Sequence, residues 1–143
     1  MFDLTCDVVE PLRHGSLFLA GDAASLLAPA AAKGANLAVL EAEILAEALA
    51  DALTHGDTAG LDTYSDRCLA HIWRAQEFTG WMTRLLHAVP EQDRGAGAAE
   101  GTDAGEGAGA GSFFQAALQR SRLNSLRTSR VYQDWFAENY VGV

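Results

Sequence analysis

The sequence predicts a mainly α-helical protein with a short β-hairpin near its N-terminus. Two long segments carry apolar residues at spacings of three or four, which is the period of a helix that buries one face. The chain before them holds short apolar runs between glycine and proline, a pattern typical of strands and turns. A segment rich in glycine and alanine precedes a further helical segment at the end of the chain.

The expected hairpin comes first. Residues Thr5–Glu10 and Leu17–Ala20 read as strands, with a turn through Pro11–Gly15 between them. Leu17–Ala20 is apolar at consecutive positions, which favours a strand covered on both faces inside a larger sheet. That strand ends at Gly21 and Asp22, and the ends of strands are where α/β folds place ligand sites.

The first long helix is expected to start near Gly34 and to end at His55, with Gly56 as a left-handed C-cap residue. The acidic side chains of this segment are expected on its solvent-facing sides: Glu41, Glu43, Glu47 and Asp51. Its apolar stripe consists of Leu37, Leu40, Ile44, Ala48 and Ala52, widened by Leu45, Leu49 and Leu53.

The second long helix is expected from about Gly60 to His87, with Asp57 or Thr58 as its N-cap and Pro90 after its end. Three aromatic residues are expected to widen its core face: Trp73, Phe78 and Trp81. Its apolar stripe consists of Leu61, Tyr64, Cys68, Ile72, Ala75, Met82, Leu85 and Val89.

The chain divides into three predicted parts. Residues 1–93 carry the strands and both long helices, and residues 94–111 form a glycine-rich flexible linker. Residues 112–143 form a C-terminal segment, with a helix from Phe113 to about Arg130. The arginines of this segment are expected to form a solvated basic face: Arg120, Arg122, Arg127 and Arg130.

Composition narrows the classes of function. The net charge of -9 over 143 residues argues against nucleic-acid binding. No apolar run is long enough for a membrane span or a signal peptide, so we expect a cytoplasmic protein without a membrane partner. Cys6 and Cys68 are expected to be free thiols, and the four scattered histidines predict no metal site.

The segment from Gly21 to Gly34 is the candidate ligand site. A helix N-terminus presents unpaired amide groups, and the small residues before it let a flat or anionic ligand approach the backbone. Asp22 could accept hydrogen bonds from ligand hydroxyls, as on the ribityl chain of a flavin. The alternative is that Asp22 only caps a short helix over Ala23–Ser25.

At these residues the sequence resembles the 4-hydroxybenzoate 3-monooxygenase (p-hydroxybenzoate hydroxylase) family of FAD-dependent aromatic hydroxylases. The similarity is carried by VVEPLRHGSLFLAGDAA, PAAAKGANLA, YSDRCLAHIWRAQEFTGWMTRLLH and AENYVG. It implies the C-terminal part of an FAD-binding α/β, Rossmann-like hydroxylase fold. Because no GxGxxG motif follows an opening strand, we expect the chain to be a fragment that lacks an N-terminal flavin and substrate domain.

The resemblance also implies roles for individual residues. The carboxylate of the Gly21-Asp22 motif would hold the flavin ribityl chain. The backbone at Ala35 and Asn36 would hold the isoalloxazine ring, with Lys33 and Gly34 alongside. Pro29 would present its carbonyl to a phenolic substrate, and Tyr140 would belong to the network that deprotonates the phenol. The family motif differs here at Ser25, Ala28, Ala30 and Ala31.

Two functions follow from these predictions. The first is part of an aromatic hydroxylase that uses FAD, NAD(P)H and oxygen on an aromatic small molecule. The second is a stand-alone helical module for protein interaction or oligomerisation, such as a homodimer, without catalytic activity. In the second case a partner or a second copy would cover the apolar strand at Leu17–Ala20.

Overall fold

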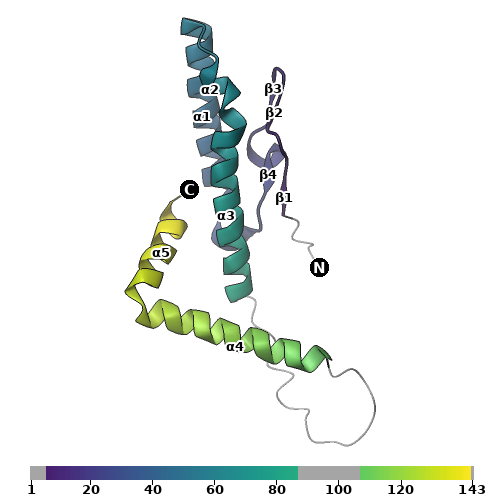
Figure 1. Ribbon diagram of the computed structural model, residues 1–143, viewed down its shortest axis with the longest axis vertical. Coiled ribbons are helices and arrows are strands. Elements are labelled where there is room, and N and C mark those ends of the chain that lie inside the picture. Colours follow the sequence, from purple (N-terminus) through teal and green to yellow (C-terminus); the bar gives the residue numbers. More distant parts are fainter. Residues whose placement is uncertain (1–5, 87–106, 143) are drawn as a thin grey trace, which may run out of the picture. The chain divides into compact units, whose positions relative to one another are not determined.

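The computed structural model describes residues 6–86 and 107–142. The chain forms two compact units (Figure 1). The first unit spans Met1–Thr83 together with Ala137–Val143, and the second spans Arg84–Phe136. Most of the predicted linker, residues 94–106 of 94–111, lies outside the described residues.

The first unit opens with short strands and single helical turns. The strands are β1 (Asp7–Val8), β2 (Arg13–His14), β3 (Leu17–Phe18) and β4 (Ser25–Leu26). The 3-10 helices are η1 (Gly21–Ala23) and η2 (Pro29–Ala31). The helices α1 (Gly34–His55), α2 (Ala59–Asp62) and α3 (Tyr64–Leu86) follow.

The strand pairing differs from the predicted hairpin. β2 and β3 pair antiparallel around a two-residue turn that starts at Gly15, whose φ of 63° suits such a turn. This turn begins at the last residue of Pro11–Gly15, the segment that was expected to connect the two strands. β1 is therefore left to pair with β4. Leu17 is 57% exposed, so in the described part of this chain the expected cover on both faces of β3 is not present.

Helix α1 has the predicted bounds. It ends at Gly56, whose φ is 71° and whose N–H donates to the carbonyls of Asp51 and Ala52. The prediction for its polar face is wrong at Glu41, which is buried between Leu37 and Ile44. Spacings of four and three place these residues on one side of the helix. The buried face is rotated accordingly, and it leaves Leu49 and Leu53 exposed.

The second predicted helix is divided in two at Thr63, between α2 and α3. The N-cap residue of α2 is Thr58, one of the two predicted, and its side chain makes no capping hydrogen bond. Asp57 supports the same turn, because its Oδ1 accepts a 2.9 Å hydrogen bond from the Ala59 N–H. The turn of α2 lies very close to α1. A Cβ placed on Gly60 would be 3.0 Å from the Cβ of Ala48. A side chain at Gly60 would therefore push α2 away from α1.

The core of the first unit lies between α1 and α3, which run side by side in opposite directions (Figure 1). The buried residues of this core are Leu12, Ala24, Leu37, Ile44, Tyr64, Cys68, Ile72 and Ala75. Phe78 and Trp81 are buried and stacked 5.9 Å apart, as predicted for core aromatics. Trp73 is instead 52% exposed, and its Nε1 donates a 2.7 Å hydrogen bond to Glu10.

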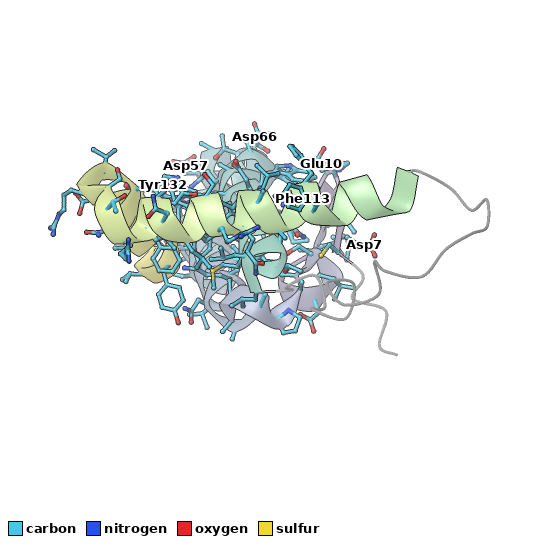
Figure 2. All side chains as sticks on the ribbon, turned by 90° about the horizontal axis from the view of Figure 1, so that it is seen from below. Asp7, Glu10, Asp57, Asp66, Phe113 and Tyr132 are labelled. Carbon is cyan, nitrogen blue, oxygen red and sulfur yellow. The ribbon has the colours of Figure 1, made fainter. Side chains whose placement is uncertain are left out.

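The second unit contains α4 (Gly107–Thr128), which starts before the predicted Phe113, and the first part of α5 (Arg130–Val141). Figure 2 shows the side chains of Phe113 and Tyr132 towards opposite ends of this helical segment. Within the unit, Gln119 donates a 2.6 Å hydrogen bond to the Leu85 carbonyl at the end of α3. Three of the four predicted basic-face arginines are exposed, Arg120, Arg127 and Arg130, whereas Arg122 is half-buried.

Cys6 and Cys68 are both free thiols, as predicted, with Cys6 exposed and Cys68 buried. Among the described residues, no helix combines the length and the apolar character needed to cross a membrane. Within residues 6–86 and 107–142, no three or more histidine, cysteine or acidic side chains gather as a metal site would require.

Candidate functional site

The Gly-Asp turn, Gly21-Asp22, follows β3 and forms the start of η1. Gly21 has a φ of 62°, in the left-handed region that favours glycine. Its N–H donates a 2.6 Å hydrogen bond to Oε2 of Glu41 on α1. This hydrogen bond joins the Gly-Asp turn to a residue of α1 that lies twenty positions later in the sequence.

A second buried side chain holds the same stretch of backbone. Tyr64, the first residue of α3, donates a 2.8 Å hydrogen bond from its hydroxyl to the carbonyl of Leu19. Burial raises the pKa of the Tyr64 hydroxyl, so this group stays a neutral donor over the ordinary pH range. Burial also raises the pKa of Glu41, although the Gly21 hydrogen bond opposes that effect. The segment before Asp22 is therefore anchored to both long helices.

Asp22 itself is exposed. Among the described residues its carboxylate has no hydrogen-bond or ion-pair partner. The interpretation of Asp22 as a cap for Ala23–Ser25 is wrong, because the N-cap of η1 is Ala20 and no side chain caps this turn. Asp22 lies within the turn instead, with its carboxylate available to a ligand.

The N-terminal half of α1 lies against this turn. A Cβ placed on Gly21 would be 3.5 Å from the Cβ of Ala38 in α1. The helix begins at Gly34, and its first hydrogen bond runs from the Leu37 N–H to the Lys33 carbonyl. The amides of residues 34–36 therefore have no carbonyl one turn earlier to accept from them. Ala35 and Asn36 are exposed, so these amides are open to a ligand from the solvent side.

Pro29 is the first residue of η2 and is exposed. Its carbonyl accepts a 3.1 Å hydrogen bond from the Ala32 N–H. A carbonyl oxygen has two lone pairs, so one acceptor site of Pro29 is left. Ala32 has a φ of 51°, an uncommon conformation for a residue with a Cβ.

Lys33 is only 2% exposed although it carries an ammonium group. Its Nζ donates a 2.7 Å hydrogen bond to the carbonyl of Tyr140 and another to the carbonyl of Gly142. Burial, together with the nearby charge of Arg74, lowers the pKa of Lys33. That Lys33 contacts a cofactor stays a prediction. The structure shows a second role, which is to hold the C-terminal segment at the start of α1.

Arg74 of α3 holds the same C-terminal segment. Its guanidinium donates a 3.1 Å hydrogen bond to Glu138 and a 3.0 Å hydrogen bond to Asn139. These contacts, with those of Lys33, place the backbone of Tyr140 at the start of α1. The side chain of Tyr140 is 52% exposed.

The structure thus brings most of the predicted site residues to one part of the first unit. Gly21 and Asp22 lie against α1, whose first turn contains Gly34, Ala35 and Asn36, and Lys33 links that turn to Tyr140. Glu41 is a residue of this site that the sequence patterns did not predict. The signal was the run Leu37, Glu41, Ile44 and Ala48, in which a carboxylate occupies a position of the buried stripe.

The Gly-Asp turn and the first turn of α1 are therefore the candidate ligand site, and comparison with known families assigns the class of the chain. The model of the FAD binding domain family matches residues 1–79, which include the Gly-Asp turn and the start of α1. The chain therefore belongs to this family of FAD-binding domains.

The similarity to one curated relative indicates a narrower class of protein than the family match does. The chain is 38% identical, over 136 residues, to a p-hydroxybenzoate hydroxylase from Acinetobacter baylyi (strain ATCC 33305 / BD413 / ADP1). The match covers 95% of this chain and 29% of the relative. The chain thus spans less than a third of the length of the hydroxylase that it resembles.

Proposed function

We propose that this chain forms the ribityl and isoalloxazine side of an FAD site in a flavin-dependent aromatic hydroxylase of the 4-hydroxybenzoate type. The observation that carries the proposal is the position of Asp22, an exposed carboxylate without a partner in the described part of the chain. It lies on a turn that two buried side chains anchor. Membership of the FAD-binding-domain family and similarity to a p-hydroxybenzoate hydroxylase support it.

The residues present fit the flavin part of FAD. The Asp22 carboxylate accepts hydrogen bonds from ribityl hydroxyls, and such bonds to a charged acceptor are stronger than neutral ones. The first amides of α1, at Gly34, Ala35 and Asn36, donate to the polar edge of the ring. The positive end of the helix dipole favours electron density there. Gly21 lets the turn adopt its left-handed backbone.

The other two predicted residues belong to the substrate side. Pro29 presents its carbonyl to the phenol, and Tyr140 takes part in moving the phenolic proton. When bound, the flavin supplies the oxidation chemistry, with NAD(P)H as reductant and oxygen as the source of the hydroxyl group. The remaining flavin and substrate contacts come from a complementary flavin- and substrate-binding part. This arrangement is consistent with the 29% of the relative that the chain spans.

Ligand titrations followed by amide NMR test this function. FMN carries the ribityl chain and ring without the adenosine half, whereas ADP carries the adenosine half alone. We expect FMN to shift the amide signals of Asp22 and of residues 34–36, and ADP to leave them in place. The Asp22→Ala variant should weaken the FMN response. Shifts with ADP alone, or an FMN response confined to other residues, would refute the proposal.

The second candidate function is a module for protein interaction or oligomerisation. One observation favours it, which is that Phe113, Phe114 and Leu123 of α4 are large apolar side chains exposed to solvent. Sedimentation velocity over a range of concentrations distinguishes this function from the first. Self-association that is lost in a Phe113→Ser, Phe114→Ser variant would support it, and a monomer at all concentrations would exclude a homodimer.

A further inference from the structure

The side chain of Glu41 lies fully inside the first unit, with 0% of its surface exposed. Its Oε2 accepts the hydrogen bond from the Gly21 N–H, and among the described residues its Oε1 has no partner. Burying a carboxyl group with so few partners costs free energy. A leucine would fill this position of the apolar stripe without that cost. The carboxyl group therefore does not serve the core, and among the described residues its one hydrogen bond is with the Gly-Asp turn.

The direction of Asp22 depends on that contact. Gly21 directly precedes Asp22, and its φ of 62° is a conformation in which the chain changes direction sharply. Holding the Gly21 N–H fixes the peptide from which Asp22 continues. Tyr64 holds the Leu19 carbonyl, two residues before Gly21. Since Asp22 has no partner of its own in the described residues, its position is set by the backbone.

We propose that Glu41 is a positioning residue for flavin binding, because its buried carboxyl group holds the Gly21 amide and so aims Asp22 at the ribityl chain. This inference rests on the proposed function, in which Asp22 is the group that contacts the flavin. It adds a residue that contacts no ligand and acts on the site through the backbone of the Gly-Asp turn.

Three variants of the full chain separate this role from a contribution to folding. Glu41→Leu removes the acceptor and fills a similar volume. Glu41→Gln keeps an oxygen that can accept from the Gly21 N–H. Glu43→Leu is the matched control, because Glu43 is exposed on the same helix two residues further along.

The first measurement is amide hydrogen exchange by NMR, which needs no ligand. In Glu41→Leu we expect the Gly21 amide to exchange about tenfold faster or more, because its acceptor is gone. The amide of Ile72, in the middle of α3, serves as the internal reference for global stability. Glu41→Gln and Glu43→Leu should leave Gly21 exchange within about threefold of the parent, since the acceptor is kept.

The second measurement is FMN affinity, with and without Asp22. We expect Glu41→Leu to weaken FMN binding about fivefold or more when Asp22 is present. In an Asp22→Ala background the same change should have less than about a twofold effect, because the group that Glu41 positions is absent.

The outcomes distinguish this inference from the proposed function. Unchanged Gly21 exchange in Glu41→Leu overturns the positioning role, whatever FMN does. Faster exchange with unchanged FMN affinity also overturns it if Asp22→Ala still weakens binding, and the proposed function then stands. If Asp22→Ala does not weaken FMN binding, the proposed function fails and this inference fails with it. Faster exchange together with an Asp22-dependent loss of affinity supports both.

Discussion

The ammonium group of Lys33 donates a 2.7 Å hydrogen bond to the carbonyl of Tyr140, 107 residues later in the chain. The same ammonium group donates to the carbonyl of Gly142. One buried side chain at the start of α1 therefore holds the backbone at Tyr140 and Gly142. One of these carbonyls belongs to Tyr140, the residue that we propose for the substrate side.

Replacing Lys33 by methionine should release the C-terminal segment. Methionine keeps the packing of the side-chain stem but leaves the two carbonyls without a donor, at a cost of about 1–3 kcal/mol in the free energy of unfolding. We expect faster amide exchange over residues 138–142 and a lower midpoint in urea. Arg67→Met, an exposed change on α3, is the control. Equal exchange in the parent and the Lys33→Met variant would contradict this role.

Stability should depend on pH through Glu41. Its pKa is raised in the folded protein by burial, so the folded state holds the proton at pH values where the unfolded state has released it. The contribution is present below the unfolded pKa of about 4.3 and is lost as pH rises through the folded pKa. The groups close enough to influence it, Tyr64 and Cys68, also have raised pKa values and stay neutral in this range.

The measurement for Glu41 is the free energy of unfolding in urea from pH 4 to pH 8, for the parent and for Glu41→Gln. The parent should lose stability relative to the variant as pH rises, because glutamine does not titrate. A difference between the two that stays constant with pH would contradict the prediction.

The two thiols should react very differently. Cys6 is exposed, whereas Cys68 is buried, and burial raises the pKa of Cys68 to about 11. Since the thiolate is the reactive form, iodoacetamide at pH 8 should modify Cys6 and leave Cys68 unmodified until the protein unfolds. Mass spectrometry of peptides, with and without urea, measures this. Rapid modification of Cys68 in the folded protein would contradict this prediction, because it would show that the Cys68 thiol is accessible to the reagent.

A side chain at Gly56 should lower the stability of the protein, whereas a side chain at Gly34 should not. Gly56 ends α1 with a φ of 71°, so Gly56→Ala should cost about 1 kcal/mol in the free energy of unfolding. Gly34 has no positive φ, and a Cβ there would meet no atom within 4 Å. Gly34→Ala should therefore be neutral or stabilise by up to about 1 kcal/mol. Thermal unfolding of both variants, compared with the parent, tests the contrast.

Sequence patterns predicted the elements that are defined locally. The bounds of α1 followed from the helical period and from the glycine at its end, and the buried stripe of α3 followed from its spacing. The resemblance to aromatic hydroxylases placed the candidate site at the Gly-Asp turn, and the match to the FAD-binding-domain family is consistent with that placement. These signals depend on residues a few positions apart.

The partners of the polar groups could not be predicted in this way. Nothing near Glu41 in the sequence shows that its carboxyl group meets the Gly21 amide, and nothing near β1 shows that it pairs with β4. Trp73 has helical spacing suited to the core, yet it lies at the surface and donates to Glu10. In each case the partner is distant in sequence, and the choice follows from how the helices pack.

The sequence by itself therefore determined the bounds of α1 and the buried stripe of α3, because periodicity and capping act within a few residues. The class of the chain followed from its resemblance to a known family, in agreement with the FAD-binding-domain match. The tertiary structure alone decided that Glu41 faces the core, that Tyr64 holds the Leu19 carbonyl and that Lys33 binds the C-terminal segment. The physical reason is that a buried polar group must find its partner wherever packing places one. For Lys33 that partner is 107 residues away.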